Sequence, residues 1–399
     1  MTYTIKYYLY TLFTQLRFTR IINILFIVQS LHFNLIQFAF LQSLFLGGQF
    51  ISEIPSGIIS DLFGKKKIVI IGLITLSLTP IIIITSIHTS NNFRYLILVI
   101  AFVLEGVGNA LLSGSDDALF YEGIREEGQE KKYAKIRGNM QFISSITLGV
   151  ATGIGGGLYS YSSILPYICQ SFTIIIAIFI IVNVKELKTT AIKKADSSNK
   201  KNMVMEIIKV FKEMTATTNI FFIFIFTVIT VSVINSIFSF LPNYITKTGF
   251  NSSSNGTIFM IYSLLGGLVA TQAYHLAKIK IKSLSLLIVF LLVFSLALQI
   301  QSNSYIFLIG AGILYNIIDI LDPIVMQMLN LWVKDEARAT YISGLSFSIS
   351  LMSMLLNPIL GFLIQNIGMV YMLLLITLVT ILMIIFAYYM IINSKKDKS

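Results

Sequence analysis

Long, uninterrupted runs of apolar residues recur along almost the whole chain, separated by short polar stretches. An α-helix of about 20 apolar residues crosses the roughly 30 Å hydrocarbon core of a membrane. A chain inside that core must satisfy its own backbone hydrogen bonds, so only helices and closed barrels can span it. The runs are continuous, whereas barrel strands alternate between apolar and polar residues. The pattern therefore predicts membrane-spanning helices.

The apolar runs predict twelve such helices and an all-α membrane protein. Their expected bounds are 7–31, 35–61, 67–87, 94–117, 137–160, 163–184, 218–242, 254–277, 283–301, 304–331, 338–364 and 368–392. The longest polar interval, 185–217, is basic and divides the helices into two sets of six. We therefore expect two pseudo-symmetric six-helix bundles, at 1–184 and 218–399, joined by a cytoplasmic linker at 185–217.

Composition and charge support a membrane protein and indicate its orientation. Hydrophobic residues make up 56% of the chain and charged residues 12%, about half the charge of an ordinary soluble domain. Of the 29 Lys and Arg residues, 25 fall in connections on one side of the expected membrane. Because cytoplasmic loops are enriched in cations, we expect this side to be cytoplasmic, with both termini on it. The net charge of +11 then needs no nucleic-acid partner.

The residues that usually carry catalytic or metal chemistry are scarce. Cys169 is the only cysteine, which excludes an internal disulfide and a cysteine-rich metal site. The three histidines are scattered, and we find neither a phosphate-binding glycine loop nor a nucleophile triad. We therefore expect no enzyme activity, no cofactor, no metal site and no ATP-driven pumping.

A polar stretch, SEIPSGIISDLFGKKK at 52–67, covers the end of the second expected helix and the loop that leads to the third. Gly57 has no side chain, which would let the second helix pack closely on a neighbour. Gly64 would supply a tight turn. Asp61 lies at the end of its helix, where its charge opposes the helix dipole, so we expect a partner from elsewhere: a cation or another helix's N-terminus.

This loop resembles the signature loop of the major facilitator superfamily, a family of membrane transporters. The family pattern is Gly-x-x-x-Asp-Arg/Lys-x-Gly-Arg/Lys-Arg/Lys. The matching residues are Gly57, Asp61, Gly64, Lys65 and Lys66. Leu62 departs from the pattern, because it stands where the family has its first basic residue. The resemblance implies the major facilitator fold and secondary transport by alternating access between the two bundles.

In that family the loop is thought to lock the two halves together on the cytoplasmic side, through the start of the eleventh helix. Arg338 stands near that position in this chain. We therefore expect a cytoplasmic gate in which Asp61 contacts Arg338 or the adjacent helix terminus. In the simpler alternative, the lysines at 65–67 only set the topology and Asp61 only caps a turn.

Two further signatures, both of drug–proton antiporters, are incomplete. In the fourth helix Phe102 stands where the antiporters have Arg, and Glu105 stands where they have Gln. In the fifth helix the segment 149–157 is rich in glycine but lacks the expected proline. A looser similarity remains to Gram-positive proteins regarded as drug or macrolide efflux transporters. It rests on the stretches 53–57, 113–118 and 338–340.

Six ionisable side chains inside expected helices are functional candidates, because a charge deep in the membrane is costly unless it is paired or faces water. They are Arg17, Arg20, Glu53, Glu105, Asp319 and Asp322. Arg17 and Arg20 are three residues apart, so on a continuous helix they would share one face. We expect that face to point into the bundle.

The four acidic residues differ in their depth and neighbours. Glu53 falls about 12 Å from the cytoplasmic end of its helix and Glu105 about 18 Å, at a rise of about 1.5 Å per residue. Asp319 and Asp322 form a same-face pair in the tenth helix, directly before Pro323. Because proline interrupts helices, Asp322 could cap a broken helix at this point.

Two hypotheses account for the intramembrane charges. In the first, Arg17 and Arg20 neutralise Glu53 and Glu105 in a fixed network, which makes the buried charges tolerable. In the second, Glu105 or Asp319 is a proton carrier whose protonation changes as an arginine moves nearby during transport. The sequence leaves both hypotheses open.

Together these features predict a secondary transporter of a bacterial cytoplasmic membrane. We expect proton-coupled export of a hydrophobic or amphipathic small molecule, such as a drug or antibiotic. One alternative is import of a nutrient or organic anion, recognised by Arg17 and Arg20. Another is a membrane protein that transports nothing, such as an immunity or sensory protein. The expected partners are the small molecule, protons and the lipid bilayer, and the expected state is a monomer.

Overall fold

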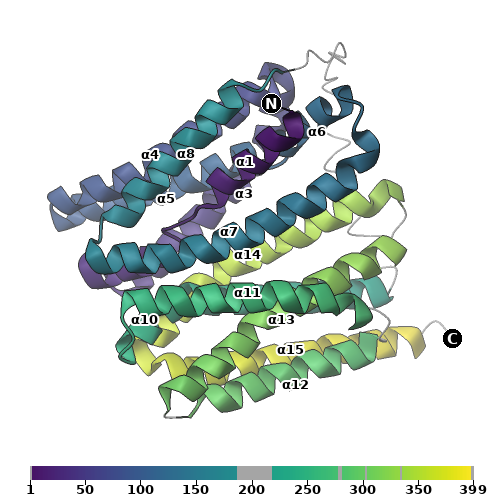
Figure 1. The fold of residues 1–399 in the computed structure, drawn as a ribbon. Helices are drawn as coiled ribbons and strands as arrows, with labels where there is room; N and C mark the ends of the chain where they lie inside the picture. Colours follow the sequence, from purple (N-terminus) through teal and green to yellow (C-terminus); the bar gives the residue numbers. More distant parts are fainter. Residues whose placement is uncertain (1, 187–217, 277–280, 302, 333–334, 397–399) are drawn as a thin grey trace. The chain divides into compact units, whose positions relative to one another are not determined.

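The chain folds as a succession of long helices (Figure 1). The computed structural model describes residues 2–186, 218–276, 281–301, 303–332 and 335–396, and this part of the chain contains no strand. Of the expected linker at 185–217, all but the first two residues lie outside the described residues.

The first half of the chain contains α1 to α8 and three short turns of other helix types. Their bounds are α1 Tyr3–Gln15, α2 Ile22–Ile24, the π-helical turn η1 Leu25–Ser30, α3 Leu35–Phe63, α4 Lys65–Thr85, η2 Ser86–His88, α5 Asn91–Leu112, α6 Ser115–Glu126, η3 Glu130–Lys132, α7 Tyr133–Tyr161 and α8 Leu165–Val182. The later helices are α10 Thr218–Lys247, α11 Ser252–Leu276, α12 Ile281–Gln299, α13 Ser304–Trp332, α14 Asp335–Ile367 and α15 Met369–Lys396.

These elements confirm the prediction of twelve spans. Among the described residues, nine helices are long and apolar enough to cross a membrane, and two shorter apolar helices cover Ser283–Gln299 and Met369–Ile385. The first expected span appears as the succession α1, α2 and η1. The structure therefore differs from the sequence prediction in the continuity of some spans.

Two compact units make up the molecule. The first unit contains α1 to α8 together with Ser239–Leu264 and Asn357–Phe362. The second unit contains the remaining described parts of α10, α11 and α14, with all of α12, α13 and α15. In the second unit α12 packs against α13 and α15.

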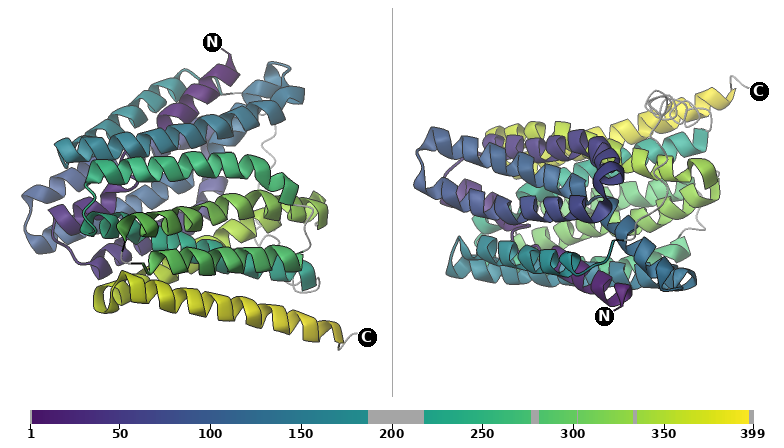
Figure 2. Two further views of the ribbon diagram at one scale, coloured as in Figure 1. Left: turned by 60° about the horizontal axis from the view of Figure 1, so that its bottom comes forward. Right: turned by 90° about the horizontal axis from the view of Figure 1, so that it is seen from above.

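Small residues allow close packing in the first unit. Helix α3 packs on α5, and α4 packs between α5 and α8. Figures 1 and 2 show α4 and α5 side by side. A Cβ atom added to Gly106 of α5 would overlap with the carbonyl oxygen of Phe45 in α3, and one added to Gly48 would lie 2.8 Å from the Val103 carbonyl oxygen. Glycine at both positions therefore lets these two helix backbones approach each other.

The helix α3 has well-defined ends. Its N-cap residue is Asn34, whose side-chain oxygen accepts the Gln37 backbone N–H at 2.8 Å. In return, the Gln37 side-chain oxygen accepts the Asn34 N–H at 3.0 Å, which completes a capping box. Gly64 ends the helix with a φ of 97°, a conformation that glycine adopts far more readily than other residues.

The first span is interrupted between α1 and α2. Residues 16–21 are not helical; the Arg17 N–H bonds to the Gln15 carbonyl at 2.8 Å, two residues back. The expectation that Arg17 shares a face of a continuous helix with Arg20 is therefore wrong. The chain here lies against α7, where a Cβ at Gly155 would overlap with the Phe18 carbonyl oxygen. Irregular backbone at membrane depth is tolerated where protein buries it or where it lines a water-filled cavity.

Two other expectations about continuity are also corrected. The fourth expected span divides at Ser113 and Gly114, between α5 and α6, and Gly114 has a φ of 76°. In contrast, α13 runs without a break through Pro323, so Asp322 does not cap a broken helix. A proline removes one backbone hydrogen bond but does not always end a helix in a membrane, because other groups can satisfy the freed carbonyl.

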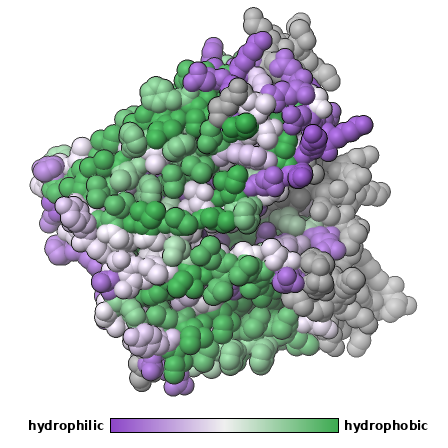
Figure 3. Space-filling model, in the orientation of Figure 1, coloured by the Kyte–Doolittle hydropathy of each residue, from purple (hydrophilic) through white to green (hydrophobic). Residues whose placement is uncertain are grey.

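The surface of the molecule is suited to lipid. Figure 3 shows hydrophobic residues over the sides of the helices and hydrophilic residues gathered where α1 begins and α6 ends. On α8, for example, Phe172 and Phe179 are 63% and 64% exposed. Exposed apolar area of this extent marks a protein that meets a membrane or a partner.

Candidate functional site

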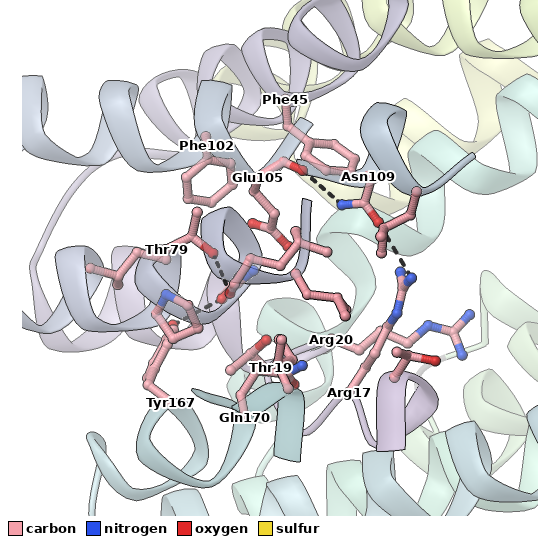
Figure 4. A pocket seen from close by; sticks show the side chains of 18 of the residues that line it. Arg17, Thr19, Arg20, Phe45, Thr79, Phe102, Glu105, Asn109, Tyr167 and Gln170 are labelled. Carbon is pink, nitrogen blue, oxygen red and sulfur yellow. Dashed lines mark hydrogen bonds between the residues drawn. The ribbon is translucent and has the colours of Figure 1, made fainter. Parts of the chain in front are cut away.

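A cavity of about 180 Å³ lies inside the first unit (Figure 4). Its lining comes from α1, the interruption at 16–21, and helices α2, α3, α4, α5 and α8. The charged side chains in the lining are Arg17, Arg20 and Glu105, and the aromatic rings of Phe45 and Phe102 lie among them. With all three charged groups ionised, the lining carries one net positive charge.

Glu105 and Arg17 are connected through an amide. The Arg17 guanidinium donates to the Asn109 side-chain oxygen at 3.4 Å, and the Asn109 side-chain nitrogen donates to the Glu105 backbone carbonyl at 2.8 Å. Within the described residues, the Glu105 carboxylate makes no ion pair. The carboxyl group therefore lies at the cavity without a direct counter-ion from the described residues.

The fixed-network hypothesis included Glu53, which the structure places elsewhere. Glu53 lies on α3 with an exposed side chain, and it is not part of the cavity lining. In the part of the chain that is described, its carboxylate forms no ion pair. Of the four side chains in that hypothesis, Arg17, Arg20 and Glu105 share one cavity and Glu53 does not.

The lysines of the polar loop contact the first unit itself. Lys65 forms an ion pair with Glu122 of α6. The Lys66 ammonium donates to the Val182 carbonyl at 2.7 Å, and the Lys66 backbone N–H donates to Glu186 at 3.2 Å. The start of α4 is thereby attached to α6 and to the end of α8.

Asp61 and Arg338 are the other two charged members of the expected gate. Asp61 lies in the last turn of α3 and Arg338 in the first turn of α14, but both side chains lie outside the described part of the structure. The contact between them therefore stays a prediction. Among the described residues, no atom lies within 4 Å of a Cβ added at Gly57. The close packing expected at Gly57 therefore stays a prediction.

Asp319 and Asp322 belong to the second unit. Both lie on α13, where Asp322 is exposed and Asp319 is half-buried. A Cβ at Gly266 of α11 would overlap with the Asp319 carboxylate, so glycine makes room for this side chain. The Asn316 side-chain nitrogen donates to the Gly312 carbonyl at 2.6 Å, one turn before Asp319.

A second polar cluster, at the start of α6, was not predicted from the sequence. The Tyr10 hydroxyl donates to Asp116 at 3.0 Å. Asp117 forms an ion pair with Arg137 of α7 and accepts a hydrogen bond from Tyr7. The cluster joins α1, α6 and α7. The sequence offered one signal, the adjacent acids of the stretch 113–118, but it could not identify their partners.

The sequence also did not reveal the uncharged polar side chains of the cavity. The Tyr167 hydroxyl donates to the Asn23 side-chain oxygen at 3.0 Å, which links α8 to α2. Gln170, one turn further along α8, also lines the cavity. Asn109 could have been found, because it lies four residues after Glu105 and so on the same helix face. Gln170 had a weaker signal, as the one amide side chain within Leu165–Val182.

Comparisons with known proteins agree with the architecture. The family model of the Major Facilitator Superfamily matches residues 8–318 and 278–399. No curated protein sequence matches the chain.

Several solved transporter structures share the fold. A D-xylose–proton symporter is 13% identical with a TM-score of 0.74, covering 96% of both chains. The nucleoside transporter NupG is 13% identical with a TM-score of 0.78, covering 98% of this chain and 99% of its own. A bacterial homologue of the human lysosomal transporter Spinster, inward-facing and occupied, is 13% identical with a TM-score of 0.75, covering 98% and 96%.

At this identity the solved structures establish the fold, and the family model establishes the membership. The loop at 57–66, the twelve spans and the match over nearly the whole chain agree with each other. This chain belongs to the Major Facilitator Superfamily and is a multi-pass membrane transporter.

Proposed function

We propose that transport is coupled to protons and that Glu105 is the group that carries the proton. The observation that supports this is the position of Glu105 in a cavity without an ion-pair partner among the described residues. A carboxyl group in such a place can gain or lose a proton without breaking a salt bridge. The charged and titratable groups that share its cavity are Arg17, Arg20 and Tyr167. Movement of either arginine would change the proton affinity of Glu105.

The substrate that we propose is a small amphipathic molecule, and the direction that we propose is export. The aromatic rings of Phe45 and Phe102 lie in the same lining as Arg17 and Glu105, which suits a ligand with both apolar and polar parts. The proposal of export rests on the resemblance of the stretches 53–57, 113–118 and 338–340 to drug and macrolide efflux proteins. The proposed setting is a bacterial cytoplasmic membrane, with a monomeric protein and both termini in the cytoplasm.

A second candidate is uptake of an organic anion. The observation that favours it is the pair of arginines, Arg17 and Arg20, beside the single carboxylate of Glu105. Arginine presents a planar fork of donors that matches a carboxylate. Both candidates use the same cavity and the same proton carrier, and they differ in the direction of substrate movement relative to the proton.

Proton flux in proteoliposomes tests both candidates together. The purified chain is reconstituted around a trapped pH-sensitive dye, and an amphipathic compound is added outside. Two probes are used, ethidium as a cation and 4-hydroxyphenylacetate as an acid. Exchange of substrate against protons makes the lumen more alkaline, whereas co-transport makes it more acidic. A protonophore abolishes either change.

The variant Glu105→Gln tests the proton carrier, because the two side chains have nearly the same shape. We expect this variant to lose substrate-induced proton flux while it still exchanges labelled substrate across the membrane. Glu53→Gln is the matched control, since this exposed carboxylate lies outside the cavity. Unchanged proton flux in Glu105→Gln contradicts the assignment. Absence of flux with both probes contradicts both candidates, and it is the result that a protein without transport activity would give.

A further inference from the structure

The side chain of Gln170 is an unused hydrogen-bond acceptor that faces the cavity. Gln170 is 6% exposed, and its side-chain oxygen has no hydrogen-bond partner in the described structure. Figure 4 shows the side chain projecting from α8 into the space below Glu105. A buried acceptor without a donor is unfavourable, so such groups are usually satisfied. The lining therefore presents an acceptor that a ligand can use.

The other polar side chains around it on α8 are already satisfied. Tyr167 donates to Asn23 at 3.0 Å. Ser171 donates to the Ser77 carbonyl at 2.8 Å. Gln170 is thus the exception on a helix that otherwise fulfils its hydrogen bonds locally or to its neighbours. Because Gln170 lines the cavity, a ligand that enters the cavity can supply the missing donor.

Positive charge lies in another part of the same cavity. Figure 4 shows Arg17 and Arg20 projecting away from Gln170, with the Arg17 guanidinium beside Asn109. Both arginines come from the interruption of the first span, where the backbone leaves the helix. The net positive charge of the lining disfavours a simple cation as ligand and favours an acid.

We propose that the ligand is a small organic acid that also carries a hydroxyl or N–H donor. Its carboxylate binds Arg17 and Arg20, its donor binds the Gln170 side-chain oxygen, and its apolar part lies against Phe45 and Phe102. Gln170 is then a specificity-determining residue, because an acid without the donor leaves its oxygen unsatisfied. This inference rests on the proposed transport through the cavity and names the substrate class for either direction.

Ligand binding to the purified full-length protein in detergent tests the inference without any gradient. Three probes are used, and the second and third each lack one group of the first. 4-Hydroxyphenylacetate has the acid and the donor, phenylacetate has only the acid, and tyrosol has the donor without the charge. The dissociation constant of each is measured by isothermal titration calorimetry. For the wild type we expect 4-hydroxyphenylacetate to bind about tenfold more tightly than phenylacetate, because one buried hydrogen bond is gained. Tyrosol should bind most weakly.

The variant Gln170→Met keeps the length of the side chain and removes the acceptor. We expect it to bind 4-hydroxyphenylacetate about tenfold more weakly and phenylacetate unchanged, so that the two acids bind alike. The matched control is Gln299→Met on α12. Gln299 is also a buried amide with an unpartnered side-chain oxygen, and it lies outside the cavity lining. Thermal unfolding of both variants shows whether they are folded.

Three results would overturn the proposal. They are failure of 4-hydroxyphenylacetate to bind the wild type, equal binding of the two acids to the wild type, and an equal loss of both acids in Gln170→Met. Should Gln170→Met fail to fold, Gln170→Asn, which withdraws the acceptor by one methylene, is measured in its place. Failure of the proposed function gives a different result. In that case ligand binding in detergent still depends on Gln170, but adding the ligand to proteoliposomes moves no protons.

Discussion

Glu105 and Arg17 line the same cavity, yet they are connected through Asn109 and not by an ion pair. The arginine donates to the amide oxygen at 3.4 Å, and the amide nitrogen donates to the Glu105 carbonyl at 2.8 Å. Asn109 thereby holds the Arg17 guanidinium at the cavity, while the Glu105 carboxylate has no ion pair among the described residues and can take up a proton. Asn109 is therefore a positioning residue in the proposed mechanism.

Replacing Asn109 should change the pH dependence of transport. In Asn109→Asp a carboxylate replaces the amide oxygen that accepts from Arg17, so we expect an ion pair that holds the arginine away from Glu105. With Arg17 withdrawn, the charges that face Glu105 change, and the pH profile of substrate-induced proton flux should shift. Asn109→Leu removes the contact and should mainly raise KM. A profile that stays unchanged in Asn109→Asp contradicts the positioning role.

The interrupted first span lies so close to α7 that adding one methyl group to α7 at the contact should destabilise the protein. A Cβ at Gly155 would overlap with the Phe18 carbonyl oxygen, whereas one at Gly157 would meet only a side-chain atom at 3.9 Å. Gly155→Ala should therefore destabilise the protein by about 1–3 kcal/mol, the usual cost of overpacking. Gly157→Ala should be close to neutral. Thermal unfolding in detergent compares the two, and equal melting temperatures would show that the interruption adjusts freely.

In the polar stretch 52–67, replacing Gly64 and Gly57 with alanine should change the stability of the protein in opposite directions. Gly64 has a φ of 97°, and a Cβ there would lie 2.9 Å from a Glu186 carboxylate oxygen. Gly64→Ala should lower stability by about 1–2 kcal/mol, because an L-residue is strained in this conformation. Gly57 lies within α3, and no atom of the described residues lies within 4 Å of a Cβ added there, so Gly57→Ala should raise stability by about 0.5–1 kcal/mol. Melting temperatures that move in the same direction would contradict this assignment.

The two ion pairs of the first unit should differ in strength. The side chains of Lys65 and Glu122 are 23% and 16% exposed, whereas those of Arg137 and Asp117 are 43% and 38% exposed. Solvent screens the more exposed pair, which should contribute about 1 kcal/mol or less. Double-mutant cycles with Lys65→Met and Glu122→Gln, and with Arg137→Met and Asp117→Asn, measure both coupling energies. We expect the larger coupling for the Lys65 pair, and the reverse order would contradict the role of burial.

Lysine substitutions in the same loop provide a matched comparison. Lys65 and Lys66 contact α6 and α8, whereas Lys67 is exposed. Lys65→Gln and Lys66→Gln should each reduce the transport rate, because the start of α4 is less firmly held. Lys67→Gln should leave the rate unchanged. Equal effects of all three substitutions on transport would indicate that these lysines act only through membrane topology.

The gate between Asp61 and Arg338 predicts a rescue. If the two charges attract each other in one state of the cycle, Asp61→Arg and Arg338→Asp should each lower the transport rate. The double variant that exchanges the charges should recover part of it. Initial rates of proton flux in proteoliposomes provide the measurement. A double variant no more active than its slower parent would argue against a direct contact and for separate roles.

Much of the fold followed from the sequence alone. The length of each apolar run determines whether a helix can cross the membrane, and this property depends only on consecutive residues. The twelve spans, the all-α class and the loop at 57–66 could therefore be predicted. Gly64 was also predictable, because a tight turn between two long helices requires a residue that tolerates positive φ.

The candidate site depended on tertiary structure. Arg17 and Glu105 were recognised as unusual from their depth, but their meeting in one cavity depends on how the helices rotate and pack. Gln170 needed the structure most, because its unsatisfied oxygen is defined by neighbours far away in the chain. Glu53 is the opposite case. Its depth in the expected helix also made it a candidate, but the structure leaves its side chain exposed.

The sequence thus determined which segments enter the membrane and which charges accompany them, because hydrophobicity and charge act locally along the chain. Only the tertiary structure decided where the first span is interrupted. That interruption lies where the Phe18 carbonyl meets Gly155, a residue more than a hundred positions away. Contacts between distant helices leave no periodic signal in either helix, and these contacts place the two arginines, Glu105 and Gln170 around one cavity.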